Sequence, residues 1–132
     1  WRAHEDAGVP VSLATDVGGG TSLALLRTMA DAYKVQALQH VRLPAWKALY
    51  TATRGAARAL GLEHEIGSLD TGCLADVALW DWAHGAVAVA RDDAARTLHE
   101  RVFAWMTLAD ERNLLATWVA GQPLYQRMEA TR

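Results

Sequence analysis

The stretch VSLATDVGGGTS, residues 11–22, places an acidic residue at the end of an apolar run and follows it with consecutive glycines. The run from Val11 to Asp16 is short, mostly apolar and not alternating, which predicts a strand buried on both faces of a parallel sheet. The last side chain of such a strand faces the ligand site in α/β folds. Asp16 is therefore our candidate catalytic or metal-binding residue, and the glycines let the backbone turn sharply behind it.

Two other interpretations of this stretch remain open. Asp16 could simply cap the turn by accepting hydrogen bonds from nearby backbone amides, as many strand-end aspartates do. Alternatively, Gly18, Gly19 and Gly20 precede a predicted helix and could cradle a phosphate, although the lysine of a nucleotide-binding P-loop is missing.

The composition is that of a globular domain rather than a disordered or membrane-spanning chain. Apolar residues make up 52% of the 132 residues, and the formal net charge of -2 gives no field that would attract nucleic acid. No apolar run approaches the ~20 residues that span a bilayer, so no membrane partner is expected. The single cysteine, Cys73, favours a reducing, cytoplasmic location. The chain begins with Trp1 instead of Met, which we interpret as the interior of a longer protein.

Helical spacing of apolar residues predicts three helices. The first is capped by Thr21 or Ser22 and extends to about His40. The second begins at Pro44 and ends at Gly61, with Gly55 inside it explained by close packing against another backbone. The third is capped by Asp92 or Asp93 and covers about residues 93–111.

Two segments in the second half of the chain have the signals of sheet strands. Turn residues in 67–72 precede a β-rich run from Val77 to Trp82. A second strand, Thr117 to Ala120, leads into a predicted hairpin that turns at Gly121 and Gln122. We expect both strands in one small sheet that does not include Val11 to Thr15.

Other residue types that could carry chemistry have simpler explanations. The histidines His4, His40, His64, His84 and His99 show no H-x-H or H-E-x-x-H spacing and are expected at surface or core positions. Cys73 has no neighbouring histidine to activate it as a nucleophile. Trp80, Trp82, Trp105 and Trp118 could form an aromatic box for a planar base, but such tryptophans are usually core or interface residues.

Three segments resemble the amidohydrolase superfamily, and within it the guanine deaminases. The segment VSLATDVGGGTSLALLRTMADAYKV is similar to the region where the eighth barrel strand ends in a metal-site aspartate. The segment LPAWKALYTATRGAARALGLEHEIGSLDTGCLADVALWD resembles the passage from the last barrel helices into a small β-domain, and FAWMTLADERNLLATWVAGQPLY resembles the C-terminus of the guanine deaminases. Two departures, Cys73 for a usual lysine and Leu43 for a usual helix cap, lie away from the site.

The resemblance implies an α/β chain that forms the end of a (β/α)₈ TIM barrel and strands of an appended β-sandwich. Residues 1–66 would complete the barrel, and residues 67–132 would return to the sandwich. The intact protein would be a homodimer that uses zinc to hydrolyse guanine to xanthine and ammonia. Asp16 would contact the metal and accept the proton of the attacking water.

The resemblance also shows what this chain does not contain. The family's metal-binding histidines, general-acid glutamate and guanine-binding side chains all lie upstream of the eighth strand. Another amidohydrolase deaminase, acting on cytosine, a triazine or another aminoheterocycle, is therefore an alternative. For what this chain does on its own, we favour a non-catalytic fragment or subunit that folds only against the missing part of the barrel.

Overall fold

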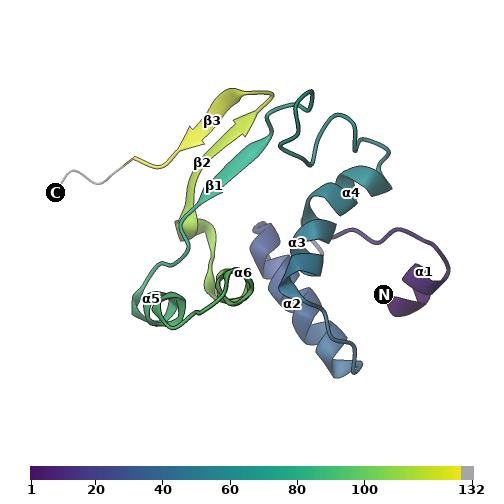
Figure 1. Cartoon of the computed structure of the whole chain (residues 1–132), viewed down its shortest axis with the longest axis horizontal. Helices are drawn as coiled ribbons and strands as arrows, with labels where there is room; N and C mark the ends of the chain where they lie inside the picture. Colours follow the sequence, from purple (N-terminus) through teal and green to yellow (C-terminus); the bar gives the residue numbers. More distant parts are fainter. Residues whose placement is uncertain (129–132) are drawn as a thin grey trace.

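The computed structural model describes residues 1–128, in which helices α1 to α4 precede a sheet, and helices α5 and α6 lie between its first and second strands in the chain (Figure 1). The elements are α1 (Arg2–Asp6), α2 (Leu25–Leu38), α3 (Ala45–Ala52), α4 (Arg54–Ala59), β1 (Val77–Trp80), α5 (Ala86–Asp93), α6 (Leu98–Leu108), the 3₁₀ turn η1 (Glu111–Asn113), β2 (Leu114–Val119) and β3 (Gln122–Gln126).

The hydrophobic core lies where α2, α3 and α6 pack together. Leu26 and Met29 of α2 meet Val102 and Met106 of α6, and all four are buried. The small residues of α3 allow this close approach, since Ala45 and Ala48 are completely buried. Each fully buried large apolar side chain contributes roughly 1.5–3 kcal/mol. The core therefore joins helices from both halves of the sequence.

The strands form an antiparallel sheet in the order β1–β2–β3. This confirms that the segments predicted around 77–82 and 117–120 share one sheet. The β2–β3 turn falls at Ala120 and Gly121, one residue earlier than predicted, and both residues have positive φ as a type I′ turn requires. Asp76 Oδ1 accepts a hydrogen bond from the Ala120 backbone amide at 2.7 Å, which holds this conformation.

The strand predicted from Val11 to Asp16 is wrong for this structure. Residues 9–16 have no regular secondary structure, and a single backbone hydrogen bond, from Leu13 N to Thr51 O at 3.0 Å, ties the segment to α3. A strand exists only when a neighbouring strand accepts its ladder hydrogen bonds, and β1, β2 and β3 are paired elsewhere. The predicted burial on both faces is also not found, because residues 11–16 alternate between half-buried and exposed positions.

The helix predicted from Pro44 to Gly61 is interrupted at Thr53. Thr53 lies outside the helical region at φ -129° and ψ -105°, and its hydroxyl donates to the Leu49 carbonyl at 2.8 Å. Such side-chain bonds to a preceding carbonyl compete with regular helix geometry. Gly55 follows the break, and a Cβ there would lie 2.8 Å from both the ring and the carbonyl of Tyr50. The predicted close packing at Gly55 is therefore confirmed.

The predicted caps at Thr21, Ser22, Asp92 and Asp93 also differ from the structure. Ala24 occupies the N-cap position of α2, and the Ser22 hydroxyl accepts a hydrogen bond from its amide at 3.0 Å. The helix predicted over about 93–111 is shorter at both ends: Asp93 is the last residue of α5, and α6 covers only Leu98–Leu108. The side chain of Thr97 caps α6 by accepting from the Glu100 amide at 3.2 Å. Asp92 pairs with Arg101 instead.

No described helix has the length and apolarity needed to cross a bilayer. The division into domains at residue 66 stays a prediction, and residues 129–132 of the predicted second domain lie outside the described residues.

Candidate functional site

Asp16 lies at the start of a tight turn that precedes α2. Its backbone is in the left-handed region at φ 49°, a conformation that Asp adopts more readily than most residues. Its carbonyl oxygen accepts hydrogen bonds from the amides of Gly19, at 2.9 Å, and Gly20, at 2.6 Å. The turn is therefore closed by the backbone of Asp16 and not by its side chain.

The glycines after Asp16 are required by this geometry. Gly18 has φ 99°, which disfavours any residue with a side chain. A Cβ at Gly19 would lie 2.7 Å from Oδ2 of Asp16, and a Cβ at Gly20 would collide with the carbonyl oxygen of Thr15. Side chains at these two positions would therefore displace the Asp16 carboxylate or open the turn.

Contacts on both sides of the turn hold it against the helices. On one side, Leu13 packs against the core and donates its amide to Thr51. On the other, the Thr21 hydroxyl donates to Asp31 Oδ2 in α2 at 2.7 Å. This hydrogen bond is the main reason why the pKa of Asp31 lies below its ordinary value, with Lys34 adding to the effect. The segment from Leu13 to Thr21 is thus anchored at both ends.

The Asp16 carboxylate is exposed and makes no hydrogen bond or ion pair within residues 1–128. The turn-cap interpretation required the carboxylate to accept from backbone amides, whereas the carbonyl oxygen performs that task. The phosphate-cradle interpretation required free glycine amides, whereas those of Gly19 and Gly20 are already bonded. A free carboxylate at a rigid turn can accept a proton or bind a metal ion.

Asp16 cannot form a metal site from neighbours in this part of the chain. Among residues 1–128, no group of three or more His, Cys, Asp or Glu side chains could hold a metal ion. The histidines lie in separate places: His4 in α1, His40 after α2, His64 in a turn, His84 in the loop between β1 and α5, and His99 in α6. Cys73 is half-buried, and its Sγ lies 3.9 Å from the carbonyl oxygen of His64, not from an imidazole.

Three of the four tryptophans considered for an aromatic box pack against one another. Trp105 meets Trp80 at a centroid distance of 5.8 Å and Trp82 at 6.4 Å, with interplanar angles of 78° and 75°. Edge-to-face packing of this kind leaves no parallel slot in which a planar base could stack. Trp118 lies in β2, opposite Val77, and has no ring contact with the other three. The cluster is a structural contact between β1 and α6.

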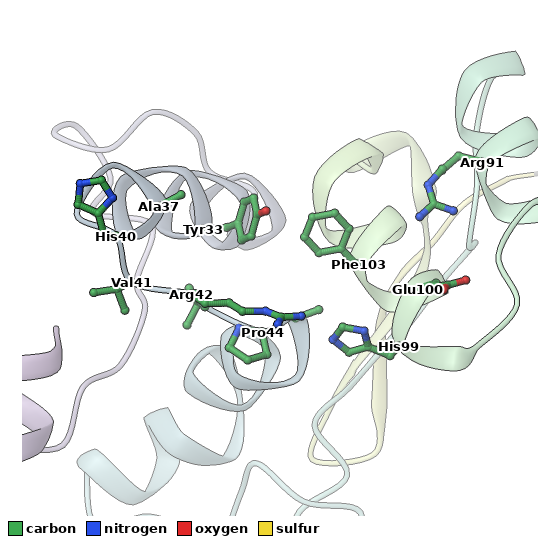
Figure 2. Close-up of a pocket in the computed structure, with 12 residues that line it drawn as sticks. Tyr33, Ala37, His40, Val41, Arg42, Pro44, Arg91, His99, Glu100 and Phe103 are labelled. Atoms are coloured by element: carbon green, nitrogen blue, oxygen red, sulfur yellow. The ribbon is translucent and has the colours of Figure 1, made fainter.

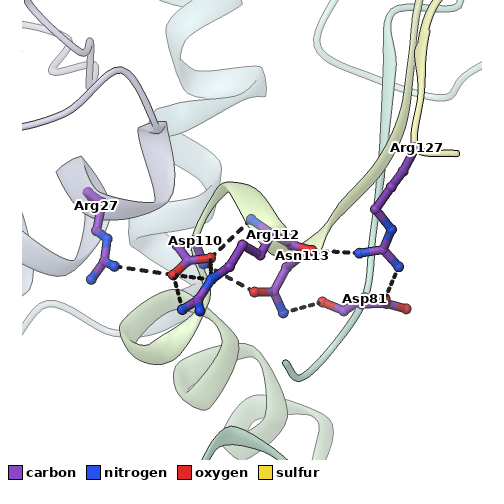
Figure 3. Close-up of polar contacts among 6 residues, drawn as sticks. All are labelled: Arg27, Asp81, Asp110, Arg112, Asn113 and Arg127. Atoms are coloured by element: carbon purple, nitrogen blue, oxygen red, sulfur yellow. Dashed lines mark hydrogen bonds and ion pairs between the residues drawn. The ribbon is translucent and has the colours of Figure 1, made fainter. Parts of the chain in front are cut away.

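The structure also contains a buried polar cluster around Asp110, which the sequence patterns did not predict (Figure 3). Asp110, 5% exposed, accepts hydrogen bonds from the backbone and guanidinium of Arg112 and pairs with Arg27 of α2 at 3.5 Å. The side-chain hydrogen bonds from Arg112 lower the pKa of Asp110 to about 2, against the opposing effect of burial.

The cluster continues from η1 into the sheet. Asn113, 1% exposed, donates to the carbonyl oxygen of Asp81 at 3.1 Å and completes a capping box with Asp110. Arg127 bonds the Asp81 carboxylate at 2.8 Å and the Arg112 carbonyl at 2.6 Å. These contacts fasten the sheet to η1 and α2. The D-x-x-N spacing of Asp110 and Asn113 is the feature of the sequence from which this capping box could have been predicted.

Residues 1–124 match the family model described as the amidohydrolase family. A guanine deaminase of Escherichia coli K12 is 39% identical over 119 residues, covering 90% of this chain and 27% of the relative. An imidazolonepropionase of Rhizorhabdus wittichii is 41% identical over 99 residues, covering 74% of this chain and 23% of the relative.

Solved structures of related proteins superpose on this chain. The E. coli guanine deaminase structure superposes with a TM-score of 0.90 at 37% identity, over 93% of this chain and 29% of that chain. A zinc-bound adenosine deaminase from Xanthomonas campestris has a TM-score of 0.72 at 24% identity, over 92% of this chain and 27% of that chain, and shows the fold alone. The chain thus spans between a fifth and a third of the length of these proteins.

Proposed function

Because this chain belongs to the amidohydrolase family, we propose that it is the C-terminal portion of a zinc-dependent guanine deaminase and that Asp16 is its contribution to the active site. The observation that carries the proposal is the exposed, unpaired carboxylate of Asp16 on a turn that only glycines permit. The similarity to the E. coli guanine deaminase, in sequence and in structure, supports guanine as the substrate.

The donor chemistry of Asp16 fits the metal that the family implies. Carboxylate oxygens are ordinary zinc ligands, but a catalytic zinc site needs about three protein ligands, so the others must come from outside the described residues. When bound, a divalent metal such as zinc supplies the Lewis acidity that lets water lose a proton near neutral pH. The rigid glycine turn would hold the Asp16 carboxylate in a fixed orientation toward that water.

In the proposed reaction, Asp16 accepts the proton from the attacking water at a carboxylate oxygen. The oxygen of the water forms a bond to C2 of guanine, and the bond from C2 to the exocyclic nitrogen breaks. One of the two protons of the water ends on this nitrogen, which leaves as ammonia, and the other ends on ring N3 as C2 becomes the carbonyl carbon of xanthine. A general base placed in this way accelerates a reaction by roughly 10²- to 10⁴-fold.

Several finer features belong to this proposal as well. The segment that ends at Asp16 would be the eighth strand of a (β/α)₈ barrel, where missing strands would provide its ladder partners. The sheet of β1, β2 and β3 would be part of a small β-sandwich. The intact protein would be a cytoplasmic homodimer.

A second amidohydrolase activity is the main alternative. The imidazolonepropionase similarity reaches 41% identity over 99 residues, so this part of the chain does not by itself select a substrate. Assaying the intact protein with guanine, cytosine and an aminotriazine separates the possibilities. We expect xanthine and ammonia in equal amounts from guanine and at least a hundredfold lower kcat/KM with the others. A higher kcat/KM for another aminoheterocycle would overturn the guanine assignment.

A further inference from the structure

A cavity of about 500 Å³ opens between the C-terminal end of α2 and the first turns of α6 (Figure 2). Its apolar wall includes Leu43 and the rings of Tyr33 and Phe103, which meet edge to face at a centroid distance of 5.0 Å and an angle of 77°. Cavities of roughly 300–1,000 Å³ with apolar walls and a few polar groups are typical of small-molecule sites. The volume and lining therefore suit a ligand with one or two rings.

Two arginines reach the rim of this cavity from different elements. Arg42 comes from the connection between α2 and α3, and Arg91 comes from α5. Within residues 1–128, neither forms an ion pair, whereas five other arginines pair with carboxylates. Figure 2 shows the Arg42 side chain extending toward the imidazole of His99. A guanidinium without a carboxylate partner is suited to bind a phosphate or carboxylate group.

The charge balance of the lining favours an anion. Glu100 is the single carboxylate among the lining residues, and its Oε2 accepts a hydrogen bond from the Arg96 backbone amide at 2.7 Å. This hydrogen bond already uses one of the Glu100 carboxylate oxygens as an acceptor, at the start of α6. Arg42 and Arg91 together outweigh this charge, and His99 adds a hydrogen-bonding imidazole nearby.

The turn that presents Arg42 is anchored. His40, just after the C-cap of α2, is in the left-handed conformation at φ 57°, and the Val41 amide donates to the Gln36 carbonyl at 2.9 Å. The next residue, Leu43, is only 3% exposed and packs in the hydrophobic core, which holds the backbone next to Arg42 in place. Because the turn is already ordered, less conformational entropy is lost when a ligand binds to Arg42.

We propose that this cavity binds a small planar organic anion, namely an aromatic or heteroaromatic ring that carries a phosphate or carboxylate group. The ring would lie along the outer side of the Tyr33–Phe103 pair, not between the two rings, and the anionic group would lie between Arg42 and Arg91. Asp16 does not line the cavity. It precedes α2, whose 14 residues extend about 20 Å at the standard rise per residue, so this inference does not depend on the proposed reaction.

Isothermal titration calorimetry of the intact protein with phenyl phosphate tests the proposal. We expect saturable binding that weakens about tenfold in Arg42→Gln and in Arg91→Gln, because each loses a charge-assisted hydrogen-bond donor. Arg58→Gln removes the same charge from an exposed position on α4 and should leave the affinity unchanged. Circular dichroism of each variant checks that the fold is retained.

Further ligands separate the two parts of the site. Benzoate should bind with the same dependence on the two arginines, whereas benzyl alcohol, which lacks the charge, and inorganic phosphate, which lacks the ring, should each bind at least tenfold more weakly than phenyl phosphate. The proposal is overturned by absence of saturable binding, by equal affinity for inorganic phosphate, or by an affinity that Arg58→Gln lowers as much as Arg42→Gln. Displacement of phenyl phosphate by guanine would also overturn it, since the anion would then occupy the substrate site.

Discussion

Replacing Asp110 with asparagine should lower stability at neutral pH by an amount that can be worked from its surroundings. The pKa of Asp110 is lowered from 3.8 to about 2 by the hydrogen bonds from Arg112. At about 1.4 kcal/mol per pKa unit, this difference corresponds to roughly 2 kcal/mol of folding free energy for the ionised carboxylate. Asn keeps the shape and one acceptor oxygen but loses the charge that pairs with Arg27 and Arg112.

The loss should depend on pH in a defined direction. A carboxyl group with a lowered pKa in the folded state stabilises the protein above its unfolded pKa, and this contribution disappears as the pH falls through the folded pKa. The wild-type protein should therefore be more stable than Asp110→Asn by about 1–2 kcal/mol at pH 7. The difference should shrink between pH 4 and pH 2.

Urea denaturation of the intact protein, treated with chelator so that metal loss at low pH does not intrude, measures this difference. Asp93→Asn is a matched control, because Asp93 is exposed and makes no ion pair within residues 1–128; its effect should stay within about 0.5 kcal/mol. Equal stability of Asp110→Asn and wild type at pH 7, or a difference that persists unchanged at pH 2, would refute the reasoning.

Three further predictions concern the core, a helix contact and the isolated chain. Met106→Ala, at a position 1% exposed, should lower the free energy of unfolding by about 2–5 kcal/mol, whereas Met128→Ala, 91% exposed, should leave it unchanged in the same urea titration. Gly55→Ala should lower the Tm, because its Cβ would lie 2.8 Å from the ring and carbonyl of Tyr50; a raised Tm would contradict the packing described for α3 and α4. The 132-residue chain by itself should bind no stoichiometric zinc by elemental analysis and release no ammonia from guanine, since one carboxylate cannot replace about three ligands.

Local sequence signals predicted the parts of the fold that depend on nearby residues. The β-rich runs around Val77 and Thr117 became paired strands, and Gly55 proved to be a close-packing position. The three glycines after Asp16 correctly indicated a tight turn. For the glycines the cause lies within a few residues of the signal, whereas the strands also depend on each other, since Val77 pairs with Trp118.

Features that depend on distant residues were not predictable in the same way. The segment from Val11 to Asp16 has a strand-like pattern, but strand formation needs a partner that the described residues do not supply. The Asp110 cluster joins Arg27 to η1 and Asp81 to Arg127, across separations that no local pattern reveals. Helix breaks at Thr53 and before Thr97 arise from specific hydrogen bonds that helical periodicity does not encode.

Substituting Asp16 with asparagine in the intact protein, with kcat for guanine and bound zinc measured on the same samples, tests the proposed role of this carboxylate most directly. Asn is nearly isosteric but cannot accept the proton, so kcat should fall roughly 10²- to 10⁴-fold at saturating zinc while the Tm stays near wild type. Asp6→Asn, an exposed aspartate in α1, should change neither value. A fully metallated Asp16→Asn protein that retains kcat within about threefold of wild type would contradict the account.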